Sequence, residues 1–390
     1  MKRTSDVIVI GAGIMGCSAA YHLAHRGLKV TVLEKETVGA GGTGRSSAII
    51  RQHYSNELTA RMAVHSLRVF QDFDAAVGGD CGFQSTGWVA LASTRDKAGL
   101  ESNVAFQLPF GVKTGLLSLD DLREMVPGLD TSDVAAVAYE PDSGYADPHL
   151  TVNGYADAAR RYGAEIQVYT EVTAIRFDGD RVAGVGTPGG DYSAPAVLNC
   201  AGPWGARVAK LAGVEVPIDS CRVQVAVFRR PAAYRRHPVV MDFIQGVYLR
   251  PETGNLTLVG SIDPAEANAV VDPEDYPEHG DADFVTEMAE RFVKRYPPME
   301  TSESTTAYAS LYAVTPDWHP IVDELPAGSG SFICSGFSGH GYKLGPAVGV
   351  MVADLITGTS SPEFPTDLFR ASRFAEHDLV RGRYEYSIAG

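Results

Sequence analysis

Basic residues and paired cysteines are scarce in this chain. Its 390 residues contain 33 Lys plus Arg against 48 Asp plus Glu, which gives a formal net charge of −15. This balance argues against nucleic acid or an anionic membrane as a partner, because neither would meet a basic surface. The five cysteines are odd in number and form no C-x-x-C pair. We therefore expect reduced thiols, no disulfide framework and no metal site.

Long apolar segments are scarce as well. No stretch approaches the roughly 18 apolar residues that a membrane span needs. The apolar run near the N-terminus is too short, and too interrupted by glycine, for a signal peptide. Hydrophobic residues nevertheless make up 45% of the chain, enough for a large buried core. These features predict a cytoplasmic globular protein.

The first 34 residues carry the pattern of a nucleotide-binding β-α-β unit. A β-branched run at residues 6–10 leads directly into G-x-G-x-x-G at residues 11–16. Small and apolar residues then follow at helical spacing to residue 25, and a second apolar run at residues 29–33 ends at Glu34. An acid placed about 20 residues after the glycines is typical of a group that binds a ribose hydroxyl. The complete order of strand, turn, helix, strand and acid favours an adenine dinucleotide site over an ordinary glycine-rich turn.

The physical roles of this motif are specific. Its first glycine allows the tight turn, the second lets the backbone approach a pyrophosphate, and the third lets the helix close on the sheet. The helix N-terminus offers free N–H groups to the phosphates. The motif alone leaves NAD and FAD open. Residues 38–47 (VGAGGTGRSS) form a loop that a minimal NAD fold does not need, and they favour the larger flavin.

Later segments alternate between two kinds of structure. The apolar run ending in a glycine turn at residues 196–205, and a similar one starting at residue 331, indicate returns to the nucleotide sheet. Period-two alternation at residues 221–228 and 246–262 predicts an antiparallel sheet, with a hairpin turn at residues 251–254. We expect an α/β plus antiparallel β fold with the ligand between its two parts. The expected division is a Rossmann-like FAD-binding domain at residues 1–85, 146–215 and 305–390 and an interleaved substrate domain at residues 86–145 and 216–304.

Several individual elements are also predicted. Helical spacing of apolar residues predicts helices at residues 58–73, 119–125, 151–162 and 346–356. Alternation predicts one strand at residues 165–175. Residues 263–283 hold eight acids, and no Lys or Arg lies between Arg250 and Arg291. A solvated loop is the expected role of this acidic segment, with a mobile lid as the alternative.

Five sequence blocks, spread over residues 6 to 356, resemble FAD-dependent oxidoreductases of the D-amino-acid oxidase family. The blocks are GAGIMG with Glu34, GRSSAIIRQHYS, AVLNCAGPWG, LYAVTPDWHPIVD and GFSGHGYKLGPAVG. Within that family the chain is most similar to sarcosine oxidases and to the β subunits of heteromeric sarcosine oxidases. The resemblance implies a D-amino-acid-oxidase-like (glutathione-reductase-2-like) fold and a bound FAD.

The resemblance also implies which residues bind the cofactor. They fall on the first glycine turn, the acid after the second strand, the loop that follows it, the returning strand and the last glycine turn. The implied set is Gly11, Gly13, Ile14, Met15, Glu34, Lys35, Gly42, Thr43, Ser46, Ser47, Val172, Ala201, Gly202, Trp204, Gly339, Gly341, Tyr342 and Lys343.

For the substrate, the resemblance implies that Arg51 and Lys343 hold a carboxylate. A pocket beside an apolar flavin ring needs fixed cations to bind an anion. The alternative is that both are solvated surface charges. Tyr248 and Tyr312 match aromatic hydroxyls over the substrate, with core packing as the alternative for each. His340 is expected at the flavin edge in a backbone role, with base catalysis as the alternative.

Two positions depart from the family pattern. The cysteine that bonds the flavin covalently in monomeric sarcosine oxidases is replaced by Ser310, so we predict non-covalent FAD. The lysine that those oxidases place near flavin N5 aligns with Thr257 or Leu258. No lysine occurs between Lys210 and Lys294, so electron transfer to oxygen is in doubt.

The implied reaction is oxidation of the C–N bond of a secondary or N-methylated amino acid of the sarcosine type. Hydride would pass to FAD, and the imine would hydrolyse, with oxygen or another acceptor taking the electrons. One alternative is an FAD-dependent 2-hydroxy-acid dehydrogenase. Another is a flavoprotein subunit that is active only in a heteromeric complex. The expected partner is a small amine that carries a carboxylate, with the chain acting as a monomer or as a subunit of a hetero-oligomer.

Overall fold

One layer of the molecule is a six-stranded sheet. The structure is a computed structural model, and it describes residues 3–234, 236–263, 265, 269–360 and 362–382. Five strands are parallel, and the edge strand β19 is antiparallel to its neighbour β20. Every residue of the central strands β2 and β3 is buried, as expected for β-branched runs in a sheet that is covered on both faces. In spatial order the strands are β19 (Ile321–Glu324), β20 (Ser331–Ser335), β13 (Ala196–Asn199), β2 (Val7–Ile10), β3 (Val30–Leu33) and β9 (Glu165–Gln167).

Helices pack together over this layer, and a small sheet shares a core with it. Helix α1 contacts α6 and α9, and α9 also contacts α2. The four helices are α1 (Ile14–His25), α2 (Glu57–Gln71), α6 (Pro148–Arg161) and α9 (Gly341–Thr357). Ile8 and Leu33 of the six-stranded sheet share a buried cluster with Val185 of the small sheet. That sheet contains β1 (Arg3–Thr4), β12 (Tyr192–Ser193), β11 (Arg181–Gly186) and β10 (Ala174–Asp178). Two short helices are α3 (Phe73–Ala76) and α7 (Gly205–Leu211).

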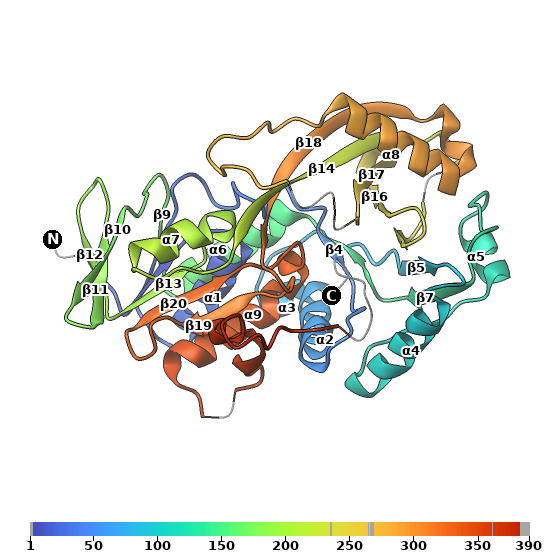
Figure 1. The fold of residues 1–390 in the computed structure, drawn as a ribbon. Helices are drawn as coiled ribbons and strands as arrows, with labels where there is room; N and C mark the ends of the chain where they lie inside the picture. The colour runs from blue at the N-terminus through green and yellow to red at the C-terminus, as the bar shows by residue number, and fades with distance from the viewer. Residues whose placement is uncertain (1–2, 235, 264, 266–268, 361, 383–390) are drawn as a thin grey trace.

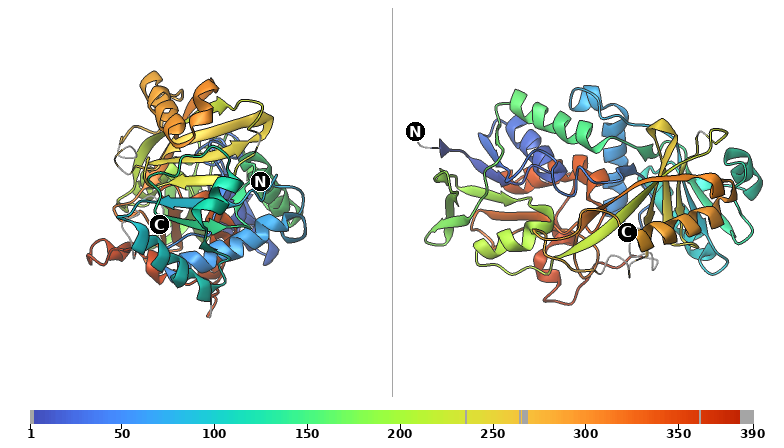
Figure 2. Two further views of the ribbon diagram at one scale, coloured as in Figure 1. Left: turned by 90° about the vertical axis from the view of Figure 1, so that its right-hand side faces the viewer. Right: turned by 90° about the horizontal axis from the view of Figure 1, so that it is seen from above.

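The second layer is an eight-stranded sheet in which β15 and β5 are parallel and all other neighbours are antiparallel. Its order is β18 (Glu303–Val314), β14 (Asp219–Arg229), β17 (Leu256–Ser261), β16 (Val247–Glu252), β15 (Val239–Asp242), β5 (Trp88–Ala92), β7 (Ala136–Glu140) and β6 (Gly115–Leu116). Strands β14 and β18 are long and run side by side from the first layer into this sheet (Figure 1). The eight-stranded sheet and the small four-stranded sheet lie at opposite ends of the molecule (Figure 2).

Three helices complete the second layer, and a separate strand pair precedes Arg51. Helix α8 (Ala282–Arg295) buries Phe284, Met288 and Phe292 at intervals of four residues, so one apolar face packs on the sheet. Helices α4 (Lys97–Gln107) and α5 (Leu119–Met125) lie on the side of the molecule that holds β7 (Figure 1). Strand β4 (Ile49–Ile50) pairs with β8 (Gly144–Tyr145).

The sheets confirm the expected α/β plus antiparallel fold. The hairpin is confirmed as β16 and β17, with its turn at residues 253–255. The helix at residues 119–125 is confirmed as α5. Helix α8 was not predicted. The domain boundaries stay a prediction, although most of β18, assigned to the FAD-binding domain, pairs with β14 in the eight-stranded sheet.

The predicted single strand at residues 165–175 is wrong. The structure has β9 and β10 there, in two different sheets. Between them the chain turns at Tyr169, whose φ is +52°. The N–H groups of Tyr169 and Thr170 donate to the carbonyls of Glu36 and Glu34, so the segment after β3 replaces a strand partner. Alternation along the sequence cannot show this change of partner.

The predicted helix at residues 346–356 begins too late. Helix α9 starts at Gly341 and contains Pro346. A proline often marks the first helical position, which explains the prediction. The true start places the first turn of α9, including Lys343, at the wall of a cavity.

Candidate active site

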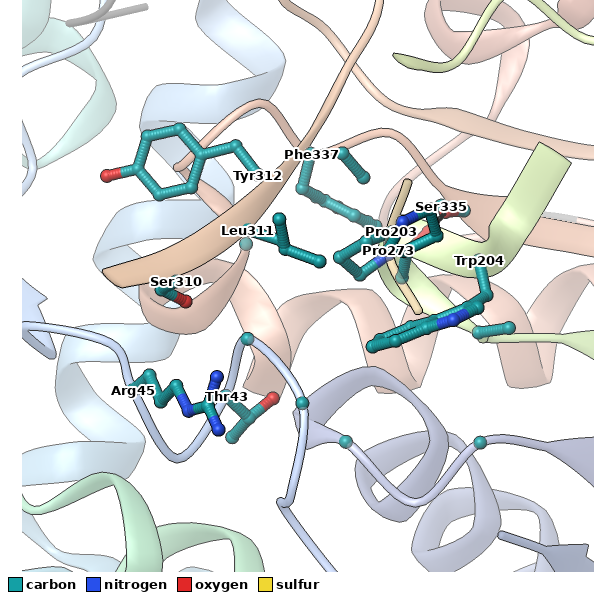
Figure 3. A pocket seen from close by; sticks show the side chains of 18 of the residues that line it. Thr43, Arg45, Pro203, Trp204, Pro273, Ser310, Leu311, Tyr312, Ser335 and Phe337 are labelled. Carbon is teal, nitrogen blue, oxygen red and sulfur yellow. Dashed lines mark hydrogen bonds between the residues drawn. The ribbon is translucent and has the colours of Figure 1, made fainter. Parts of the chain in front are cut away.

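A cavity of about 910 Å³ lies between the two layers. Its volume is near the upper end of the range of roughly 300–1,000 Å³ for small-molecule and cofactor sites. Figure 3 shows Thr43 and Arg45 on one wall and Ser310 to Tyr312, on β18, opposite them. Apart from His340, every site residue predicted from the sequence lines this one cavity: Gly11, Gly13, Ile14, Met15, Glu34, Lys35, Gly42, Thr43, Ser46, Ser47, Arg51, Val172, Ala201, Gly202, Trp204, Tyr248, Tyr312, Gly339, Gly341, Tyr342 and Lys343.

The glycine turn before α1 has the geometry of a phosphate cradle. Gly11 has a φ of +100°, and a Cβ at this position would lie 2.7 Å from the carbonyl oxygen of Cys200. Only glycine fits such a turn without strain. No side chain caps the N-terminus of α1 at Gly13, although the Ile14 N–H donates to Thr43 Oγ1 over 3.0 Å. The turn therefore presents backbone N–H groups at the positive end of the helix dipole.

The carboxylate of Glu34 is fixed at the end of β3. Its Oε2 accepts from the Ala12 N–H and its Oε1 from the Glu36 N–H, both over 2.8 Å. The two bonds hold the acid beside the glycine turn. The cradle, the fixed acid and the cavity volume together fit a flavin adenine dinucleotide.

Trp204 and Lys35 lie at the Glu34 end of the cavity, where the family resemblance implies the adenosine part of FAD. The Lys35 ammonium lies 4.0 Å from the centre of a Trp204 ring. Both side chains also donate a hydrogen bond to Oε1 of Glu274, over 2.7 Å from Lys35 Nζ and over 2.5 Å from Trp204 Nε1. Arg45 bonds to Tyr276 and Glu278 in the same way, over 2.5 and 2.7 Å.

Residues 273–278 thus belong to the cavity wall. The acids of this part of the segment are exposed, as the predicted solvated loop requires, but Glu274 and Glu278 also pair with Lys35 and Arg45 on the first layer, which that prediction did not include. Sequence reasoning missed this contact, since its partners lie far away in the sequence. It also missed Arg45, although Arg45 lies inside the GRSS block. The wall residues Val225, Met241 and Ile262 carried no signal beyond strand alternation.

Two buried cations lie at the other end of the cavity. Arg51 follows β4 and is 3% exposed, and Lys343 in the first turn of α9 is 7% exposed. The Arg51 guanidinium donates to the His53 carbonyl and lies 4.5 Å from the centre of the Tyr54 ring. Burial, together with the nearby charge of Arg51, holds the pKa of Lys343 well below its usual value. An anion at this end would favour the charged form of Lys343, so Arg51 and Lys343 together form a site for an anion.

Two buried phenols complete this end. Tyr248 comes from β16 and Tyr312 from β18. Burial raises the pKa of both hydroxyls, so both stay protonated and able to donate at neutral pH. The turn before α9 packs closely on Tyr312, because a Cβ at Gly339 would lie 2.7 Å from its ring.

The histidines lie behind the wall. His340 is the N-cap residue of α9, and its ring lies 5.8 Å from that of Tyr54. His53 contacts the side-chain amides of Asn103 and Gln107, and burial lowers its pKa to about 3. Its ring is therefore neutral.

The two positions that depart from the family pattern differ in whether they line the cavity. Ser310 lines the cavity. Thr257 does not, and its hydroxyl lies 2.6 Å from the Arg230 guanidinium inside the eight-stranded sheet. Among the residues that the structure describes, the cations on the cavity wall are Lys35, Arg45, Arg51, Arg207 and Lys343. None of these five belongs to the eight-stranded sheet.

The comparison with protein families shows which family the chain belongs to. A family model described as FAD dependent oxidoreductase (DAO) matches residues 6–355. The chain belongs to this family. DAO-family members bind FAD, and the cavity described above holds the residues suited to it.

Some relatives are much longer than this chain, and others have a similar length. Human mitochondrial sarcosine dehydrogenase is 29% identical over 370 residues, covering 91% of this chain and 40% of that protein. The chain thus spans about two fifths of that relative. Glycine oxidase from Geobacillus kaustophilus is 26% identical over 364 residues, covering 91% of this chain and 94% of that enzyme.

Among solved structures, L-proline dehydrogenase from P. horikoshii superposes with a TM-score of 0.90 at 30% identity, covering 98% of this chain and 100% of that chain. In the described part of the chain, no helix is both long and apolar enough to cross a bilayer.

Proposed function

We propose that the protein oxidises the C–N bond of a secondary or N-methylated amino acid. The observation that carries this proposal is the buried pair Arg51 and Lys343 in the same cavity as the dinucleotide turn. The names of the relatives agree with it, because they include sarcosine dehydrogenase, glycine oxidase and 4-methylaminobutanoate oxidase.

Each group at this end of the cavity has a proposed role. Arg51 and Lys343 bind the substrate carboxylate, and the hydroxyls of Tyr248 and Tyr312 orient the amine. The apolar side chains of Met241 and Ile262 exclude water. When bound, FAD supplies the acceptor for the hydride equivalent, and the imine product hydrolyses afterwards. The N-terminus of α9 directs its positive dipole at this region.

Ser310 supports non-covalent attachment of FAD, because its hydroxyl is a poor substitute for a thiol. The absence of a cation on the cavity-facing part of the eight-stranded sheet, among the described residues, favours an electron acceptor other than oxygen.

A role as a subunit of a larger complex is the second candidate. The β subunit of sarcosine oxidase from Rhodobacter capsulatus is 26% identical over 392 residues, covering 98% of this chain and 92% of that subunit. A cytoplasmic location and the oligomeric state stay predictions.

An anaerobic absorbance titration tests the proposal. The purified, FAD-loaded protein is mixed with sarcosine, other N-alkyl amino acids, proline and a 2-hydroxy acid, and then exposed to air. Bleaching by an amine is expected, with slow return of colour in air. Bleaching by the hydroxy acid alone would contradict the proposal and identify a 2-hydroxy-acid dehydrogenase. No bleaching by any compound would favour the subunit role.

A further inference from the structure

Glu140 is a buried acid directly behind the Arg51 segment. It is the last residue of β7, it is fully buried, and it does not line the cavity. Its Oε2 accepts from the Gln52 N–H over 2.8 Å and from the Ser143 hydroxyl over 2.6 Å. The bond to Gln52 ties the end of a strand in the second layer to the residue that follows Arg51.

The second oxygen of this carboxylate has no such bond. Glu140 Oε1 is buried and lacks a hydrogen-bond partner among the residues that the structure describes. The charge that acts on Glu140 is that of Arg51. The ring of Tyr54 lies against the Arg51 guanidinium. Burial raises the pKa of its hydroxyl, with smaller effects from the charges of Arg51 and Glu140, so Tyr54 remains a neutral phenol. Gln52 and Ser143, which donate hydrogen bonds to Glu140, and Trp88, which lies opposite it on β5, are uncharged.

We propose that Glu140 is a positioning residue that fixes the Arg51 segment and acts as its buried counter-charge, so that binding of a carboxylate at Arg51 is coupled to protonation of Glu140. The inference rests on the proposed function, because it takes Arg51 as the carboxylate site.

The coupling follows from electrostatics in a dry environment. Burial raises the pKa of Glu140 to about 7, and the hydrogen bonds from Ser143 and Gln52, followed by the charge of Arg51, oppose the rise. A ligand carboxylate at Arg51 adds a negative charge nearby, which favours the protonated acid further. Near pH 7 and just above it, binding therefore takes up a fraction of a proton from solvent onto the Glu140 carboxylate. By linkage, carboxylate affinity is full below pH 7 and falls as the pH rises through that value.

The test measures the Kd of a carboxylate that has no amine, so that the ligand does not titrate. Butyrate binding to the FAD-loaded protein is followed by flavin absorbance between pH 6 and 8.5. In the native protein the Kd is expected to rise about three- to tenfold over this range, as a coupling of roughly one pKa unit gives. Glu140→Gln keeps the size of the side chain and an acceptor oxygen, and it is expected to remove the part of the rise that is centred near pH 7.

Lys343 also titrates, so the comparison is repeated without it. In the Lys343→Met background the rise near pH 7 is expected to persist on weaker binding, and adding Glu140→Gln is expected to abolish it. A rise that survives Glu140→Gln in this background would overturn the inference. So would a flat profile in Lys343→Met alone.

Thermal unfolding gives a readout that needs no ligand. The pKa of Glu140 is higher in the folded chain than in the unfolded chain, so its ionisation lowers stability as the pH rises from about 4.5 to about 7. The Tm of Glu140→Gln relative to the native protein should therefore increase between pH 5 and pH 8. A pH-independent difference would overturn the charge assigned to Glu140. If butyrate fails to bind the native protein at any pH, the proposed function fails instead, and the Tm comparison still reports on Glu140.

Discussion

Tyr248 on β16 lies opposite Gly260 on β17, and its ring occupies the space where a side chain at residue 260 would stand. A Cβ there would lie 2.4 Å from the Tyr248 hydroxyl oxygen. The glycine therefore determines how the phenol is directed into the cavity.

Gly260→Ala is expected to displace Tyr248. The crowding should lower the free energy of unfolding by about 1–3 kcal/mol, and misplacement of the phenol should slow flavin reduction about ten- to hundredfold. Stopped-flow absorbance and chemical denaturation measure the two effects. Gly115→Ala is the matched control, because a Cβ on that strand glycine meets nothing within 4 Å. An unchanged reduction rate in Gly260→Ala would remove Tyr248 from the site.

Arg51→Ala is expected to weaken binding of an N-methyl amino acid about ten- to hundredfold. A charge-assisted hydrogen bond contributes roughly 1.5–3 kcal/mol, and each 1.4 kcal/mol is about tenfold in Kd. Spectral titration under anaerobic conditions measures the affinity. Arg229→Ala, which removes a half-exposed arginine paired loosely with Glu303, serves as control. Equal affinity in both variants would exclude Arg51 as the carboxylate site.

The flavin should be released by acid. Ser310 lies on the cavity wall where the oxidases that the chain resembles have a cysteine, and a serine hydroxyl does not form the same thioether. Precipitation with trichloroacetic acid should leave a yellow supernatant and a colourless pellet. A yellow pellet would contradict non-covalent binding and direct attention to the cavity-lining thiols of Cys200 and Cys334.

Glu274→Gln is expected to loosen FAD. The change removes the negative charge of the carboxylate that accepts hydrogen bonds from Lys35 and Trp204. Because partly exposed pairs contribute only about 0–1 kcal/mol each, the Kd for FAD should rise about two- to fivefold, with less effect at high salt. Flavin fluorescence on dilution measures release. Glu303→Gln is the control, since Glu303 is exposed and away from the cavity. Identical FAD affinity in the two variants would show that residues 273–278 do not hold the cofactor.

The sequence by itself determined the dinucleotide unit, because its signals are local. Buried parallel strands need continuous apolar runs, and the turn at Gly11 needs a residue that accepts a positive φ. Five residues of α9 were missed at its start, where Pro346 obscured the true beginning. The blocks shared with the DAO family also identified residues that prove to line one cavity.

Tertiary structure decided what those residues face. Arg51 and Lys343 meet because β4 and the first turn of α9 border the same cavity, and no pattern in either segment states that. Glu140 and the acids of residues 273–278 reach their partners from the second layer, so their roles depend on how the two layers pack. Burial and distance set the pKa and the charge of each group, and both arise only when segments distant in sequence come together.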